Sequence, residues 1–119
     1  MATLNVKLVF TSSDVSSDAL DLTHTDALTV GAPSVGISRI TLVGDASAST
    51  IFENNTTTTY VYLKNTDATN HIKYFNDTDD GFGILWPGEF AFFAVIDAEG
   101  LKVQANNANC ILEYGYWTK

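Results

Sequence analysis

The chain opens with a segment in which apolar positions recur at every second residue. The apolar positions are Leu4, Val6, Leu8 and Phe10. The residues between them are Asn5, Lys7 and Val9. A side-chain period of two is typical of a β-strand with one apolar face. Residues 11–36 are rich in Ser, Thr and Asp, and this composition predicts a long loop that holds short strands at 19–23 and 27–30.

Short segments rich in β-branched and aromatic residues follow, separated by turns that contain Asn, Asp, Gly or Pro. These segments are residues 37–44, 49–54, 58–65, 70–76, 84–86, 89–96, 101–106 and 110–117. Segments 58–65 and 70–76 flank the polar turn NTDAT and predict a β-hairpin. Pro87-Gly88 predicts a tight turn, because proline fixes one backbone angle and glycine frees the next. The total is about eight to ten strands.

No stretch has the apolar period of a helix, and the strand spacing is typical of an all-β domain. We expect an antiparallel β-sandwich or jelly-roll-like domain, although a barrel also fits the pattern. With 119 residues the chain is long enough for one core, so residues 1–119 are expected to form a single β domain. An extended N-terminal arm is the alternative for residues 1–30.

A set of strand residues from the second half of the chain is predicted to form this core. It contains Val61, Leu63 and Ile72, Phe90 or its neighbours Ala91 and Phe93, Ile111 or Leu112, and Tyr114. The alternatives stay open because alternation does not say which face points inward. Cys110, the only cysteine, excludes an intramolecular disulfide and is interpreted as a buried apolar residue.

The charge of the chain excludes some classes of partner. Fourteen acidic residues oppose six scattered basic ones, for a formal net charge of −8. Nucleic-acid binding needs clustered Lys and Arg, so we expect no nucleic-acid partner. The same charge repels anionic membranes, and no apolar run reaches spanning length or has the form of a secretory signal. We therefore expect no membrane partner, and we interpret the glycosylation sequons at Asn55 and Asn76 as coincidental.

Residues capable of catalysis or metal binding do not form a recognisable motif. His24 and His71 have no partner at a ligand spacing, and no serine lies in a nucleophile elbow. We therefore assign no catalytic residue, no metal ligand and no cofactor. Asp77, Asp79 and Asp80 crowd one turn, for which an Asx-rich turn is favoured over a calcium loop.

Several aromatic residues fit either a core or subunit interface, which we favour, or a platform that stacks on sugars. They are Tyr60, Tyr62, Tyr74, Phe82, Trp86 and Trp117.

The second half of the chain carries an ordered series of turn and strand signatures. These are YVYLKNTDATN, then L-x-PGEFAFF, then LKVQAN and a terminal C-x-LEY segment, within residues 57–117. The series resembles a recurrent pattern in small virion-associated proteins of tailed bacteriophages, including marine and cyanobacterial ones. The first fifty residues carry no part of it.

This resemblance implies a β-sandwich building block of a phage particle that is assembled in the host cytoplasm. Within the virion we favour a capsid decoration or cement protein that binds the major capsid protein or other virion proteins and forms homo-oligomers. A neck, tail or fibre component is the alternative in the same class, a carbohydrate-binding module the main rival outside it, and an enzyme the least favoured. Candidate subunit-contact residues are Leu4, Val6, Leu8, Phe10 and Trp86.

Overall fold

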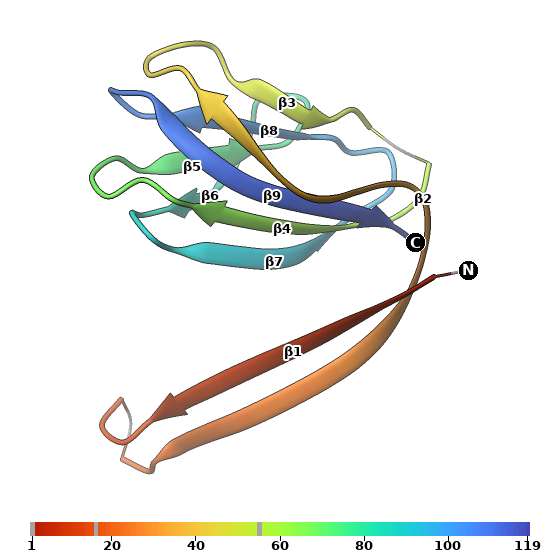
Figure 1. Cartoon of the computed structure of the whole chain (residues 1–119), viewed down its shortest axis with the longest axis vertical. Coiled ribbons are helices and arrows are strands. Elements are labelled where there is room, and N and C mark those ends of the chain that lie inside the picture. The colour runs from red at the N-terminus through yellow and green to blue at the C-terminus, as the bar shows by residue number, and fades with distance from the viewer. Residues whose placement is uncertain (1, 16, 55) are drawn as a thin grey trace. The chain divides into compact units, whose positions relative to one another are not determined.

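The structure is a computed structural model that describes residues 2–15, 17–54 and 56–119, with Pro33 described by its backbone alone. Within these residues the chain forms nine strands and no helix, which confirms the expected all-β class (Figure 1). The strands are β1 (Ala2–Ser12), β2 (Leu20–Leu42), β3 (Ser49–Phe52), β4 (Thr59–Asn65), β5 (Ile72–Phe75), β6 (Gly81–Leu85), β7 (Phe90–Val95), β8 (Leu101–Ala105) and β9 (Cys110–Thr118). The chain divides into two compact units, Met1–Gly31 and Ala32–Lys119.

The second unit is a β-sandwich with nested strand pairing. The first sheet of the chain has the strand order β1-β2-β9-β4-β7, of which β2-β9-β4-β7 contribute to this unit, and the second sheet has the order β3-β8-β5-β6. Figure 1 shows β9, β4 and β7 in one layer and β8 and β5 in the other. Among the strands β2 to β9, the first therefore pairs with the last, β2 with β9. In the same nested way β3 pairs with β8, β4 with β7, and β5 with β6. This is the path of a long hairpin rolled into two sheets, so the sandwich is a jelly roll of eight strands.

The core lies between these two sheets and is filled by alternate residues of the strands. Its fully buried members include Val61, Leu63, Ile72, Leu101, Val103 and Leu112. Leu112 points inward whereas Ile111 is exposed, and Ala91 and Phe93 pack against the core whereas Phe90 is 63% exposed. Tyr114 also packs against this core. The predicted core set is thus confirmed, and its open alternatives are resolved by the inward face of each strand.

The expected hairpin of residues 58–65 and 70–76 is wrong. β4 pairs with β7 and β9, while β5 pairs with β6 and β8, so the two strands lie in different sheets. β4 has a hydrogen-bonded neighbour on each side and offers no free edge to the strand that follows it. The turn after Asn65 therefore carries the chain across the sandwich, because the pairings are set by segments distant in sequence.

The expected long loop at residues 11–36 is also wrong. Leu20–Leu42 forms one continuous strand, β2, into which the short strands expected at 19–23, 27–30 and 37–44 merge. Its Thr, Val and Ile residues favour extended backbone, and pairing with β1 extends from Leu20 to Val30. Among the described residues of this stretch, 13–15 and 17–19 lie outside the strands, and there the Ser12 hydroxyl accepts hydrogen bonds from the backbone N–H groups of Asp14 and Val15.

Candidate functional site

The N-terminal unit is a two-stranded antiparallel ribbon formed by β1 and the first half of β2. Cross-strand partners such as Leu4 and Leu28, or Phe10 and Leu22, point to the same side, so the pairing sorts the side chains into two faces. One face, called here the apolar face of the ribbon, carries Ala2, Leu4, Val6, Leu8, Phe10, Ser12, Leu20, Leu22, His24, Asp26, Leu28 and Val30. The opposite face carries Thr3, Asn5, Lys7, Val9, Thr11, Asp21, Thr23, Thr25, Ala27 and Thr29.

Large apolar side chains of this face are open to solvent near the bend of the ribbon. Leu8 is 38% exposed, Phe10 49%, Leu20 40% and Leu22 44%. A lone two-stranded ribbon is marginally stable in water, and it gains stability when an apolar face is covered. The structure thus places the predicted contact residues Leu4, Val6, Leu8 and Phe10 together on one surface.

A second apolar surface covers the outer side of the sheet β2-β9-β4-β7. The register places Tyr62 beside Phe92 on one side and Gly115 on the other, and it places Tyr60 beside Trp117. The rings of Tyr60 and Phe92 are nearly parallel, with centroids 6.4 Å apart. We call this surface, formed by Tyr60, Tyr62, Phe90, Phe92 and Trp117, the outer aromatic face.

A polar network lies on the same sheet beside these rings. The Tyr62 hydroxyl donates a 2.9 Å hydrogen bond to Oε1 of Glu113, and Nη2 of Arg39 lies 3.1 Å from Oε2 of the same carboxylate. The hydrogen bonds from Tyr62 and Arg39 lower the pKa of Glu113. Partial burial, followed by the hydrogen bond to Glu113, raises the pKa of Tyr62. The aromatic rings are therefore bordered by a fixed hydrogen-bonding group.

Trp86 lies in the sandwich unit, at the tight turn predicted from Pro87-Gly88. The N–H of Glu89 donates to the carbonyl oxygen of Trp86 at 3.0 Å, and Gly88 has a φ of +80°, as a type II turn requires. The indole is 53% exposed and meets the ring of His71 edge-on, with centroids 5.1 Å apart. Trp86 is thus an exposed aromatic residue on a fixed turn, and it belongs to a different unit from the other predicted contact residues.

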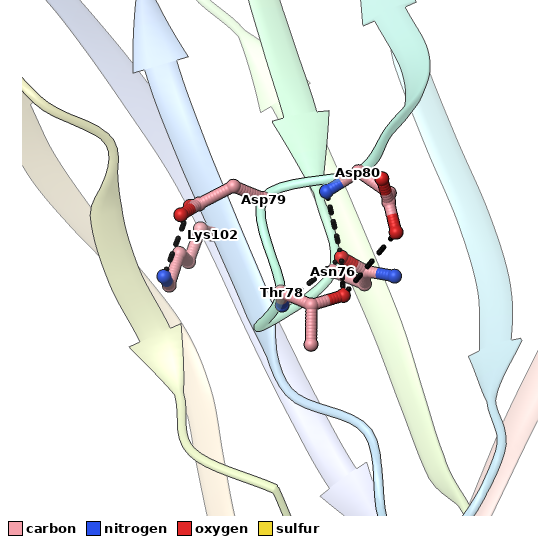
Figure 2. Close-up of polar contacts among 5 residues, drawn as sticks. All are labelled: Asn76, Thr78, Asp79, Asp80 and Lys102. Carbon is pink, nitrogen blue, oxygen red and sulfur yellow. Dashed lines mark hydrogen bonds and ion pairs between the residues drawn. The ribbon is translucent and has the colours of Figure 1, made fainter.

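The acidic turn between β5 and β6 is an Asx turn (Figure 2). Oδ1 of Asn76 accepts hydrogen bonds from the N–H of Thr78 at 3.1 Å, from the Thr78 hydroxyl at 2.9 Å and from the N–H of Asp80 at 2.8 Å. Asp79 has a φ of +67° and pairs with Nζ of Lys102 at 3.0 Å. No group of three or more His, Cys, Asp or Glu side chains with metal-binding geometry occurs in the described part of the chain.

A carboxyl pair lies beside this turn. A hydrogen bond with Asp77, partial burial and the negative charges of Asp77 and Asp80 together raise the pKa of Glu99. Two carboxyl groups that share a site disfavour joint ionisation, which is the physical cause of such a shift.

The remaining candidates for chemistry are separated from one another. His24 belongs to the ribbon and His71 to the segment before β5 in the sandwich unit. Cys110 is 1% exposed, and burial raises the pKa of its thiol, so its interpretation as a buried apolar residue is confirmed. Asn55, the first predicted sequon, lies outside the described residues.

Comparison with known protein families, with curated proteins and with solved structures finds no match for this chain. None of the described residues belongs to a helix with the length and apolar character needed to cross a bilayer.

The β2 half of the apolar face was missed by the sequence interpretation. Its signal is an alternation at Leu20, Leu22, Leu28 and Val30, interrupted by polar residues at the two middle positions. The exposed residues of the outer aromatic face were missed in part: Phe90 was expected in the core as one alternative, and the alternation of Phe90 with Phe92 was not used. Both surfaces could have been predicted from the rule that alternate side chains of a strand point to the same face.

Proposed function

We propose that this chain is a structural protein of a bacteriophage virion, namely a capsid decoration or cement protein. It binds the outside of the shell, contacts the major capsid protein or other virion proteins, and holds neighbouring capsomers together. The protein is assembled in the host bacterial cytoplasm, acts without a catalytic centre or cofactor, and works through non-covalent contacts as a homo-oligomer.

The observation that carries this proposal is the apolar face of the ribbon. A strand pair with exposed Leu8, Phe10 and Leu22 is suited to burial against another protein chain, where apolar area supplies the driving force. Many copies that share such a contact gain by avidity, as a lattice protein requires.

Two further features support the same class. Jelly rolls are common in viral capsid domains, although the fold alone does not define a function. The net charge of −8 suits an outer surface better than contact with packaged DNA.

The experiment is a count of this chain in purified particles of the phage that encodes it, by quantitative mass spectrometry against the major capsid protein. Many copies, in a fixed ratio to the major capsid protein, are expected for a decoration protein. About six or twelve copies would instead indicate a neck or tail component, because such components follow the cyclic symmetry of one vertex. Absence from the particle would overturn the proposal.

The outer aromatic face favours a second candidate, a carbohydrate-binding module. Tyr60, Phe92 and Trp117 offer apolar ring faces, and Glu113 offers acceptor oxygens beside them. Glycan-array binding that is lost in Phe92→Ala and kept in Phe82→Ala, an exposed aromatic of the other sheet, would support this candidate. An array without binding would exclude it for the glycans tested.

A further inference from the structure

The apolar face of the ribbon has a pattern that is complementary to itself. We call each cross-strand pair of residues from β1 and β2 a row. The rows of the apolar face extend from Ala2–Val30 to Ser12–Leu20. The row at the middle of the ribbon is Lys7–Thr25, whose side chains lie on the opposite face. The two rows beside this middle row are Val6–Asp26 and Leu8–His24. One acid and one imidazole therefore lie on the same strand at equal distances from the centre, while leucine, phenylalanine and valine occupy most other positions.

We propose that a second copy of this chain covers the apolar face between the Leu4–Leu28 and Phe10–Leu22 pairs, with the two ribbons packed face to face about a two-fold axis. Val30, beyond this stretch, is already buried in the single chain. The axis crosses the strands at the Lys7–Thr25 row, so the two ribbons run in opposite directions. Such an interface is isologous, because each patch meets the same patch of the other copy.

This symmetry fixes which side chains meet. Leu4 faces Phe10 of the second copy, and Val6 faces Leu8. On β2, Leu28 faces Leu22 of the second copy. Asp26 faces His24 of the second copy, and the same pair forms again on the other side of the axis. An imidazole N–H can donate to a carboxylate in either protonation state of histidine, so both polar groups acquire partners in the interface.

The alternative two-fold axis, parallel to the strands, gives poorer contacts. Each row would then face its own row with β1 over β2, so Val6 would face Asp26 and Leu8 would face His24. This arrangement buries the Asp26 carboxylate against an apolar side chain with no partner from the second copy, which costs free energy. It also places the two bends together, with Asp14 and Asp18 of both copies at one end, where like charges repel. The crossing axis separates the bends.

The charge of the ribbon agrees with this choice. Among the paired residues of the ribbon, Asp26 is the acidic residue on the apolar face. The other acidic residue, Asp21, and the basic residue Lys7 both lie on the opposite face. The backbone N–H of Ala27 donates a 2.8 Å hydrogen bond to Oδ1 of Asp26 and so helps to hold the carboxylate in place. A net charge of −8 makes copies of the chain repel one another in general. On this face the contacts are mainly apolar, and Asp26 is paired with His24 of the second copy, so the repulsion is small here.

Sedimentation equilibrium of the full chain and its variants tests the proposal, at concentrations from about 1 μM to 1 mM, which cover the usual range of moderate Kd values. The wild-type chain is expected to form a dimer. His24→Asp sets two pairs of carboxylates against each other, and Asp26→Lys sets two lysines against His24. Each should raise the dimer Kd by about tenfold or more, because facing like charges or unpaired polar groups are unfavourable.

Mixing supplies a result that misfolding cannot imitate. In a one-to-one mixture of the His24→Asp chain with the Asp26→Lys chain, every facing pair joins an acid to a base. A heterodimer should therefore form, although each variant alone forms a homodimer only weakly. The double variant His24→Asp/Asp26→Lys should restore the homodimer. Thr25→Asp, which adds the same charge on the opposite face between the two positions, should leave the wild-type Kd within about threefold, since distant or screened surface charges contribute little.

A wild-type chain that stays monomeric over this range, or forms a trimer, overturns the proposal. So does a mixture that shows no gain over its components, or a Thr25→Asp variant that is as weak as His24→Asp. The inference concerns two copies of the chain alone and does not rest on the proposed virion function. A dimer of a protein absent from particles, or a monomer present in them, would separate the two claims.

Discussion

The side-chain amide of Asn65 donates a 3.0 Å hydrogen bond to the carbonyl oxygen of Leu85 within the core of the sandwich. The same amide donates to the carbonyl oxygen of Asn70 at 2.8 Å, and its oxygen accepts from the N–H of Asp67 at 2.9 Å. The Asn65 backbone also bonds to Gly88 and Glu89. One buried residue therefore joins the turn after β4 to the turn that presents Trp86.

Replacing Asn65 should destabilise the protein because it leaves several buried backbone groups without partners. We expect Asn65→Leu to lower the free energy of unfolding by about 2–4 kcal/mol, as unmade buried hydrogen bonds do. Chemical denaturation measures this change, with Asn107→Leu at an exposed turn as the matched control. Equal stabilities of the two variants would contradict the role given to Asn65.

Asp67 gives the turn after β4 a stability that depends on pH. Backbone hydrogen bonds from Asn70 and Thr69 lower the pKa of its carboxyl group. A lowered folded-state pKa contributes stability above the unfolded-state pKa, and this stability is lost as pH falls, here from about pH 5 to pH 3. Asp67→Asn should therefore flatten the acid side of a denaturation profile. A profile parallel to that of the wild type would contradict this.

Glu99 should act in the opposite direction, because its pKa is raised. A raised folded-state pKa gives stability that is fully present below the unfolded-state pKa and is lost as pH rises through the folded-state value. Glu99→Gln removes this loss, so its advantage in melting temperature over the wild type should grow from about pH 4 to pH 7. A variant with no advantage at neutral pH would show that the pair with Asp77 does not govern stability.

Leu63 tests the assignment of the core. It is fully buried in β4, whereas Ile111 in β9 is 45% exposed. We expect Leu63→Ala to cost about 2–5 kcal/mol, and Ile111→Ala to cost much less, because only the first leaves a cavity. Urea unfolding of both variants gives the comparison. A larger loss at Ile111 would mean that the inward face of the sheet is wrongly assigned.

Local patterns in the sequence predicted strands well and strand partners poorly. The alternation in residues 58–65 correctly placed Val61 and Leu63 in the core, because the face to which each side chain of a strand points depends on the strand's own sequence alone. It could not show that β5 lies in the other sheet, since pairing with β7 and β9 depends on residues 25 or more positions away. The short distance in sequence favoured a hairpin of β4 with β5. This hairpin cannot form, because β4 is already hydrogen-bonded to β7 on one side and to β9 on the other.

The candidate site was half predicted for a similar reason. Leu4 to Phe10 had an uninterrupted alternation, so the β1 half of the apolar face was found. In β2 the alternation contains His24 and Asp26, and the Ser- and Thr-rich surroundings favoured a loop. These two polar residues broke the apolar pattern, yet they are the pair that gives the face its self-complementarity.

The central claim is that the apolar face of the ribbon joins copies of this chain, and that the resulting oligomer binds a phage particle with avidity that a single copy lacks. Phe10 and Val9 offer a matched test, because they are neighbours on opposite faces and are 49% and 50% exposed. Co-sedimentation of the Phe10→Asp and Val9→Asp proteins with particles that lack the chain should show strong loss of binding for Phe10→Asp alone, with Val9→Asp bound like the wild type. Equal binding of both variants, or failure of the wild-type chain to bind, would contradict the account.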